Sequence, residues 1–327
     1  MKILVTGGCG YVGSTVTDYF LKKGLEIIAL DILWFNKNVP KLFENNPYFK
    51  FYKQDIRDTS IFLEIIKKES VDYIIHAAAI VGDPASKLFP ELTKEINEIA
   101  TIKMIDMLNK TNIKGFIFLS TCSNYGVSKY NTLVNEESDL NPTSLYASTK
   151  VNVERYLLNT KTSFKWIICR VPTLYGISYR MRFDLTVNEF MLKAFTDKLI
   201  DIYKPESYRP YLHVKDLASI LFEIINNFIL LSNNVFNVGF LNENYKKIEI
   251  AELVRKFIPD TNIKILSEGG DNRDYKVDFT KLHRFIKINQ LYDIEKGMKE
   301  IYTFLKNNVF ADTNLDMFYN TKPKFEE

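Results

Sequence analysis

The hydrophobic pattern of roughly the first half of the chain alternates between short apolar runs and longer amphipathic stretches. The runs predict strands, most of them buried on both faces, over residues 2–6, 26–30, 49–54, 73–76, 115–120 and 166–170. The amphipathic stretches predict helices over 11–23, 60–68, 92–110 and 146–160. Strands that alternate with helices form βαβ units, so we predict an α/β fold with a doubly wound parallel sheet.

The regularity weakens after about residue 170, where turn-rich segments separate less evenly spaced elements. We predict a first domain of residues 1–171, to which later segments return. Residues 172–310 are predicted to form a smaller, partly interleaved C-terminal α/β lobe that binds the substrate. The polar tail, residues 311–327, lacks periodicity and is expected to be mobile or to pack on the surface.

The composition narrows the classes of function. An apolar fraction of 46% in 327 residues supplies a sizeable core, and a formal charge of +3 is too small to predict a nucleic-acid partner. Charged and polar residues interrupt the apolar stretches and no signal sequence is recognised, so we expect no membrane association and a cytoplasmic location. The three cysteines and three histidines are scattered, so neither a disulfide framework nor a metal site is predicted.

A glycine-rich loop joins the first predicted strand to the first predicted helix. The segment Gly7-Gly8-Cys9-Gly10-Tyr11-Val12-Gly13 has the Gly-x-Gly-x-x-Gly spacing. Glycines allow backbone N–H groups to approach a pyrophosphate, and the start of a helix offers further donors. Asp31 stands at the end of the second strand, where a carboxylate accepts the adenosine ribose hydroxyls and repels a 2′-phosphate. The sequence therefore predicts a Rossmann domain with NAD as its cofactor.

Tyr146 and Lys150 lie on one face of the helix predicted over 146–160, because they are four residues apart. An ammonium group near a phenol lowers the phenol's pKa, which a tyrosine that transfers protons requires. Thr121 follows the fifth strand, at the sheet edge where ligands bind. It is therefore placed to hydrogen-bond a substrate hydroxyl or carbonyl.

These motifs resemble those of the extended short-chain dehydrogenase/reductase family, specifically its nucleotide-sugar epimerases, dehydratases and reductases, over residues 2–306. The resemblance implies that Thr121, Tyr146 and Lys150 are the catalytic triad, and that hydride passes between C4 of the sugar and the nicotinamide. Together with the glycine loop, it implies that the cofactor-binding residues are Gly7, Gly10, Tyr11, Val12, Gly13, Asp31, Asp55, Ile56, Ala77, Ala78, Tyr146 and Lys150.

The resemblance also implies how a nucleotide-sugar substrate is held. Arg209 and Arg273 match two family arginines that hold the substrate's diphosphate, and guanidinium groups from separate segments suit such an anion. Residues 176–190 resemble a branch that includes GDP-heptose 4-dehydrogenases of bacterial surface-polysaccharide pathways. In that branch Arg180, Arg182 and Asn188 would face the nucleotide sugar.

The sequence leaves the reaction open. The family's 4,6-dehydratases carry two carboxylates after the threonine, whereas this chain has Cys122 and Ser123, which disfavours dehydration. Oxidation at C4, 4-epimerisation without net redox and reduction of a 4-keto sugar remain, as does reduction of a non-nucleotide ketone. In a different class, a catalytically silent NAD-sensing scaffold would not need Thr121, Tyr146 and Lys150 together. The resemblance further implies a homodimer formed through the helices predicted over 92–110 and 146–160.

Overall fold

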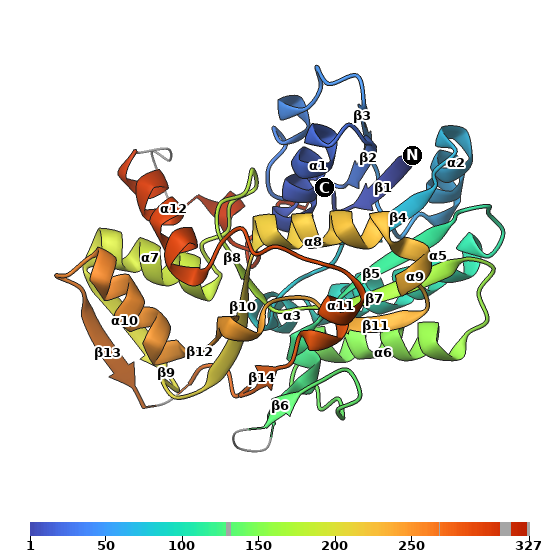
Figure 1. Ribbon diagram of the computed structural model, residues 1–327. Coiled ribbons are helices and arrows are strands. Elements are labelled where there is room, and N and C mark those ends of the chain that lie inside the picture. The colour runs from blue at the N-terminus through green and yellow to red at the C-terminus, as the bar shows by residue number, and fades with distance from the viewer. Residues whose placement is uncertain (129–131, 268, 308–314, 326–327) are drawn as a thin grey trace.

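A sheet of seven parallel strands forms the centre of the protein in the computed structural model, which describes residues 1–128, 132–267, 269–307 and 315–325 (Figure 1). The strand order is β11-β7-β5-β4-β1-β2-β3. The strands are β1 Lys2–Thr6, β2 Glu26–Asp31, β3 Phe49–Lys53, β4 Tyr73–His76, β5 Gly115–Thr121, β7 Lys165–Val171 and β11 Asn234–Asn237. All six predicted strands lie in this sheet, which confirms the doubly wound Rossmann fold. Strand β11 was not predicted, because its short sequence begins and ends with asparagine and its pairing with β7 is a long-range contact.

Helices cover both faces of the sheet, since successive side chains of a strand point to opposite sides. Ile3 and Val5 belong to a core shared with α1 and α8, whereas Leu4 belongs to a core with α2, α5 and α6. These helices are α1 Tyr11–Lys22, α2 Thr59–Glu69, α5 Thr101–Leu108, α6 Leu145–Asn159 and α8 Val214–Asn226. Figure 1 shows α8 running across the sheet close to α1. Strand β11 and helix α8, which follow residue 171, therefore pack with the elements of the first part of the chain.

The helix predicted over 92–110 is part of a longer and less regular segment. The unpredicted α3 (Asp83–Leu88) and then α4 (Pro90–Lys94) precede a π-helical segment, η2 (Glu95–Ala100), which continues into α5. Within η2, Asn97 accepts a hydrogen bond from the Ile80 amide at 2.8 Å and donates to the Ile80 carbonyl at 2.9 Å. The segment thereby fixes the loop after β4. Such π-helical turns are frequent near functional sites.

The second lobe lies beyond the carboxyl ends of the sheet strands, and its core is continuous with the α1–α8 side of the sheet. Its principal helices are α7 Thr186–Asp197, α10 Lys247–Phe257 and α12 Ile294–Lys306. Its strands are β8 Thr173–Tyr175, β10 Tyr208–His213 and β12 Asn244–Lys246 in one sheet, and β9 Leu199–Tyr203 with β13 Asn262–Leu266 in another. The remaining elements are β6 Leu133–Val134 paired with β14 Lys276–Val277, α9 Phe228–Leu231, α11 Thr280–Phe285, and the 3₁₀ turns η1 Pro40–Leu42, η3 Cys122–Tyr125, η4 Leu241–Glu243 and η5 Asp316–Phe318.

The C-terminal tail bridges the two lobes. Of the tail predicted over 311–327, residues 311–314 and 326–327 lie outside the described residues. In residues 315–325, the Phe318 ring packs against Phe183 in the second lobe, with ring centroids 5.4 Å apart. Asn320 Nδ2 donates to the Val81 carbonyl at 3.0 Å, and the Lys324 amide donates to the Trp34 carbonyl at 2.8 Å. The polar, aperiodic sequence of this segment does not reveal this position.

Candidate functional site

A cleft with a cavity volume of about 440 Å³ lies between the two lobes, at the carboxyl ends of the strands. That volume is typical of small-molecule sites. Of the residues predicted to bind cofactor or substrate or to catalyse, those lining it are Gly7, Gly10, Tyr11, Val12, Gly13, Asp31, Asp55, Ile56, Ala77, Ala78, Thr121, Tyr146, Lys150, Arg180, Arg182, Arg209 and Arg273. Asn188 is the predicted residue that does not line the cleft.

The glycine loop has the geometry that a dinucleotide needs. The Gly7 amide donates to the Leu30 carbonyl at 2.8 Å, and the Gly10 amide donates to the Gly7 carbonyl at 3.0 Å. A Cβ atom on Gly13 would lie 2.0 Å from the Gly7 oxygen, so the tight packing of loop on helix requires glycine there. The first turn of α1 has neither a side-chain cap nor an acidic residue. Its N–H groups are therefore available to a phosphate, which fits the diphosphate of NAD.

The acid predicted to bind ribose stands beside this loop. Asp31 accepts hydrogen bonds from the Cys9 amide at 3.0 Å and from the Leu33 amide at 2.8 Å. Burial raises its pKa, and the backbone hydrogen bonds of Leu33 and Cys9 oppose that rise. Farther along the cleft, the Asp55 carboxylate pairs with Arg57 at 2.6 Å. This part of the site therefore fits an adenosine ribose.

Thr121, Tyr146 and Lys150 come together at the meeting of β5 and α6. Ser144 caps α6 by accepting from the Ala147 amide at 3.2 Å, and Tyr146 lies in the first turn of this helix. Its phenol is hydrogen-bonded to the Thr121 side chain. One turn later, Lys150 Nζ donates to the Leu119 carbonyl at 3.0 Å. The spacing of four residues and the strand end thus bring the predicted triad to one side of the cleft.

Burial dominates the protonation of this group. It raises the pKa of Tyr146 to about 12, against the lowering effects of the Thr121 hydrogen bond and of the charges of Arg182 and Arg273. Burial also lowers the pKa of Lys150 to about 7, against the raising effect of Glu154. We expected Lys150 to lower the pKa of Tyr146. In this structure the lowering charges belong to the two arginines instead, because Lys150, with a pKa of about 7, carries no charge at the pH at which Tyr146 ionises.

The two arginines predicted to bind a diphosphate are brought together by one carboxylate. Arg273 Nη2 lies 2.6 Å from Asp271 Oδ2, and Arg209 Nη2 lies 2.9 Å from the same oxygen. Arg273 also hydrogen-bonds Ser123 and pairs with Asp83 at 3.2 Å. The cluster presents two oriented guanidinium groups, the arrangement that suits a diphosphate.

Sequence reasoning missed several residues of this cluster. Lys247, at the start of α10, lines the cleft, and burial together with the charge of Arg209 lowers its pKa to about 8. Nothing in the local sequence distinguishes this lysine from a surface residue. Asp271 was missed although it lies two residues before Arg273, a spacing that permits an ion pair. The cleft is also lined by the tail residues Asn320, Thr321 and Pro323. Nothing in the sequence around them indicates that they contribute to a binding site.

Arg180, Arg182 and Asn188 do not form one group facing a nucleotide sugar. Asn188 is fully buried, accepts from the Gly176 amide at 2.9 Å and donates to the Arg182 carbonyl at 2.9 Å, so it holds the loop rather than lining the cleft. Arg182 lines the cleft, pairs with Asp184 at 2.8 Å, and its charge lowers the pKa of Tyr146. The Arg180 guanidinium lies over the ring of Phe35, beyond the end of β2. The structure therefore places Arg180 and Arg182 in the lining of the cleft and Asn188 outside it.

Other residues that could carry chemistry, Cys122 and His76, are packed in the interior instead. Cys122 is buried, and its thiol donates a hydrogen bond to the Arg170 carbonyl at 3.3 Å. Burial raises the pKa of this thiol well above the usual value. His76 is buried between the Thr6 and Thr101 hydroxyls. Over the ranges that the structure describes, no group of His, Cys, Asp and Glu side chains has an arrangement suited to a metal ion. In those same ranges, no helix has both the length and the apolar character needed to span a membrane.

Comparison with known proteins connects the fold and the cleft to one family. The family described as "NAD dependent epimerase/dehydratase family" matches residues 3–239. The UDP-glucose 4-epimerase of Lactobacillus helveticus is 27% identical over 304 residues, covering 86% of this chain and 89% of that protein. The dTDP-D-glucose 4,6-dehydratase of Dictyostelium discoideum is 31% identical over 256 residues, covering 73% of this chain and 58% of that protein. The crystal structure of dTDP-glucose 4,6-dehydratase from Bacillus anthracis in complex with NAD matches with a TM-score of 0.82 and 25% identity, covering 94% of this chain and 97% of that one.

Proposed function

This chain belongs to the NAD dependent epimerase/dehydratase family, and we propose that it transfers hydride between C4 of a nucleotide sugar and NAD. The observation that carries the proposal is the position of Tyr146, whose phenol is hydrogen-bonded to Thr121 in the cleft that the glycine loop also lines. The arginine cluster around Asp271 supports a diphosphate-bearing substrate. The name of the Lactobacillus helveticus relative, a 4-epimerase, supports C4 as the reacting carbon.

Each residue of the triad has a distinct role in the proposal. NAD⁺, when bound, supplies the hydride acceptor. Tyr146, as phenolate, takes the proton of the substrate hydroxyl at Oη. Thr121 orients that hydroxyl and stabilises charge on its oxygen. Lys150 hydrogen-bonds the nicotinamide ribose and, as a cation, lowers the pKa of Tyr146, which requires its Nζ to leave the Leu119 carbonyl.

The remaining predicted residues hold the two ligands. The N–H groups of the glycine loop and first turn of α1 bind the NAD diphosphate, Asp31 binds the adenosine ribose, and the adenine lies by Asp55 and Ile56. Ala77 and Ala78 form the wall beside the cofactor. On the substrate side, Arg209 and Arg273 hold the nucleotide-sugar diphosphate. Arg182 lines the same cleft, and its charge acts on Tyr146.

The acidic residues of the cleft argue against dehydration. The carboxylates that line it each contact an arginine or a backbone amide, and Cys122 is packed away from the cavity; these carboxylates are Asp31, Asp55, Asp83, Asp184 and Asp271. Among the described residues, Asp83 Oδ1 is the oxygen of this set that is buried without a hydrogen-bond partner, which leaves one free carboxylate oxygen and not two. An elimination needs a free acid and a free base beside the sugar. Oxidation at C4, 4-epimerisation and 4-keto reduction therefore stay within the proposal. The GDP-heptose branch stays a prediction.

A panel of GDP-, UDP-, CDP- and dTDP-sugars tests the proposal, with NADH absorbance and product sugars both recorded. A net change in NADH indicates a dehydrogenase or reductase, and a changed sugar without a net change in NADH indicates an epimerase.

Tyr146→Phe is expected to lower kcat by about 10²- to 10⁴-fold while NAD affinity is retained, since the variant removes only the phenolic oxygen. Wild-type turnover in Tyr146→Phe would refute the role proposed for Tyr146. No turnover of any nucleotide sugar by the wild type would favour a catalytically silent NAD-sensing scaffold. If the substrate is instead a non-nucleotide ketone, Arg273→Ala should leave the KM for that ketone unchanged.

We also propose a homodimer formed through α6 and the helical segment from α4 to α5. These helices pack together in the chain, and Ile99 and Leu158 on them are exposed. Exposed apolar side chains on adjacent helices are consistent with a two-fold helical interface. Light scattering gives the mass directly, and a monomer at micromolar concentration would contradict this part.

A further inference from the structure

Arg180 is a buried cation with unused donors at the wall of the cleft. Its side chain is 2% exposed, and neither Nε nor Nη2 has a hydrogen-bond partner among the described residues. The guanidinium stacks on Phe35, 3.9 Å from the ring centroid. Burial, with the nearby charge of Arg182, lowers its pKa to about 9. A buried guanidinium with unpaired N–H groups is costly, so an anion that accepted hydrogen bonds from it would be held strongly.

The surroundings of Arg180 belong to the dinucleotide half of the cleft. Phe35 follows the end of β2, and Asp31 is among the charged groups that act on Arg180, after Arg182 and Asp184. Asp31 is in turn bonded to the Cys9 amide of the glycine loop. The guanidinium therefore lies near the ribose-binding acid and the loop that faces the phosphates. By contrast, the arginine pair proposed for the nucleotide sugar is gathered around Asp271.

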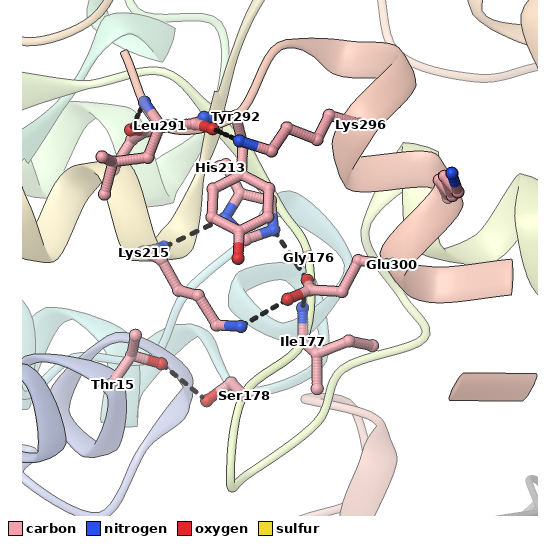
Figure 2. Close-up of polar contacts among 12 residues, drawn as sticks. Thr15, Gly176, Ile177, Ser178, His213, Lys215, Leu291, Tyr292, Lys296 and Glu300 are labelled. Carbon is pink, nitrogen blue, oxygen red and sulfur yellow. Dashed lines mark hydrogen bonds and ion pairs between the residues drawn. The ribbon is translucent and has the colours of Figure 1, made fainter. Parts of the chain in front are cut away.

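The segment before Arg180 is attached to the first turn of α1. Ser178 Oγ donates to the Tyr11 carbonyl at 2.7 Å and accepts from Thr15 Oγ1 at 3.1 Å, and Tyr11 Oη donates to the Gly176 carbonyl at 2.7 Å (Figure 2 shows the Thr15–Ser178 bond). Arg180 follows Ser178 by two residues, so its backbone lies within about 7 Å of that of Ser178. The side chain can therefore reach a phosphate held by the first turn of α1.

The same segment is attached on its other side to α12. Glu300 accepts a hydrogen bond from the Ile177 amide at 3.3 Å and from His213 Nε2 at 2.9 Å, and it also pairs with Lys215 (Figure 2). These attachments on both sides fix the backbone that carries Arg180. The arginine is thus preorganised, and a ligand would meet little cost in ordering it.

We propose that Arg180 binds the diphosphate of NAD, as a second-lobe counterpart to the N–H groups of α1. The inference rests on the proposed function for the identity of the cofactor, and it replaces the expectation that Arg180 faces the nucleotide sugar. A guanidinium can donate two parallel hydrogen bonds to one phosphate, which matches the two unpaired nitrogens. Because the arginine comes from the second lobe, the cofactor is held from both lobes and is released slowly.

The test is the affinity of protein freed of bound nucleotide for NAD, ADP-ribose, adenosine and UDP, measured by titration calorimetry. Arg180→Met keeps the apolar stem and is expected to weaken NAD and ADP-ribose by about 10- to 100-fold, with adenosine and UDP unchanged. Arg180→Lys keeps the charge but not the paired donors, so its affinities for NAD and ADP-ribose should lie between those of the wild type and of Arg180→Met. Arg255→Met is the matched control, because Arg255 lies on α10 with its side chain 48% exposed, and it should change none of these values.

Three results would overturn the inference: unchanged NAD affinity in Arg180→Met, a loss of UDP affinity in place of NAD affinity, or an equal loss for adenosine. Circular dichroism checks that the variant is folded, and if Arg180→Met is unfolded, Arg180→Lys decides by the same criteria. A wild-type protein that binds no NAD would refute the proposed function itself. That outcome is distinct from wild-type binding that Arg180 does not affect.

Discussion

The ion pair between Arg170 and Glu154 is buried in the protein interior next to the proposed triad. The two side chains are 4% and 1% exposed, and Arg170 Nη2 lies 2.7 Å from Glu154 Oε2. Glu154 also accepts from Asn124 at 2.8 Å and from Ser120, the residue before Thr121. The pair therefore joins α6 to β5 and β7, the elements that carry the proposed triad. We predict that Arg170→Met strongly destabilises the fold.

The expected loss in the free energy of unfolding follows from the burial of this ion pair. Arg170→Met leaves the Glu154 carboxylate buried without its cation, a change that costs about 3–5 kcal/mol. For a chain of this size each kcal/mol corresponds to a few degrees, so Tm should fall by roughly 6–20 °C. In Arg170→Met/Glu154→Leu both charges are gone, and apolar side chains of similar volume replace a pair whose desolvation was costly. The double variant should therefore recover at least half of the loss.

The assay is urea and thermal unfolding of the wild type, both single variants and the double variant, followed by circular dichroism as a double-mutant cycle. Arg255→Met breaks an exposed pair with Glu252 and should cost less than about 1 kcal/mol. An Arg170→Met loss as small as that of this control would refute the reasoning, and so would strictly additive effects of the two single substitutions.

Two further predictions concern the cleft. Burial lowers the pKa of Lys150 to about 7 from 10.5, so between these pH values the unfolded chain binds the extra proton and wild-type stability rises with pH. Urea unfolding at pH 7.5, 8.5 and 9.5 should show the wild type gaining on Lys150→Met by on the order of 1 kcal/mol per pH unit, and a constant difference would contradict the lowered pKa. Gly13→Ala places a methyl group 2.0 Å from the Gly7 oxygen and should abolish NAD binding. In Gly24→Ala nothing lies within 4 Å of the new methyl group, so NAD affinity should be retained despite the strain of a positive φ; equal NAD affinity in the two variants would disprove the steric argument.

The family match confirms the predicted resemblance and the predicted cofactor, NAD. Both depended on local signals. The glycine spacing, the apolar run before it and Asp31 after the next strand lie within 31 residues, and strand, turn and helix start are each set by neighbouring side chains. The Tyr146–Lys150 spacing was likewise readable, because a helix brings residues four apart onto one face.

Other parts of the site depend on contacts between distant segments. Strand β11 becomes part of the sheet only by pairing with β7, 67 residues earlier at the Asn234–Ile167 register. Arg180 belongs to the dinucleotide half because Ser178 bonds to Tyr11, 167 residues away in sequence. The tail reaches the cleft through Asn320 and Val81, which are 239 residues apart. No local periodicity encodes such pairings, since they are chosen by the packing of the whole core.

The sequence by itself determined six of the seven sheet strands, the dinucleotide loop, the preference for NAD and the pairing of Tyr146 with Lys150 on one helix face, because each follows from the steric and hydrogen-bonding needs of consecutive residues. Only the tertiary structure decided where the arginines lie and how Tyr146 and Lys150 are protonated. A pKa depends on how much water and which charges surround a group. Burial raises that of Tyr146 and lowers that of Lys150, and the charges that oppose the rise at Tyr146 come from Arg182 and Arg273, in distant segments of the chain.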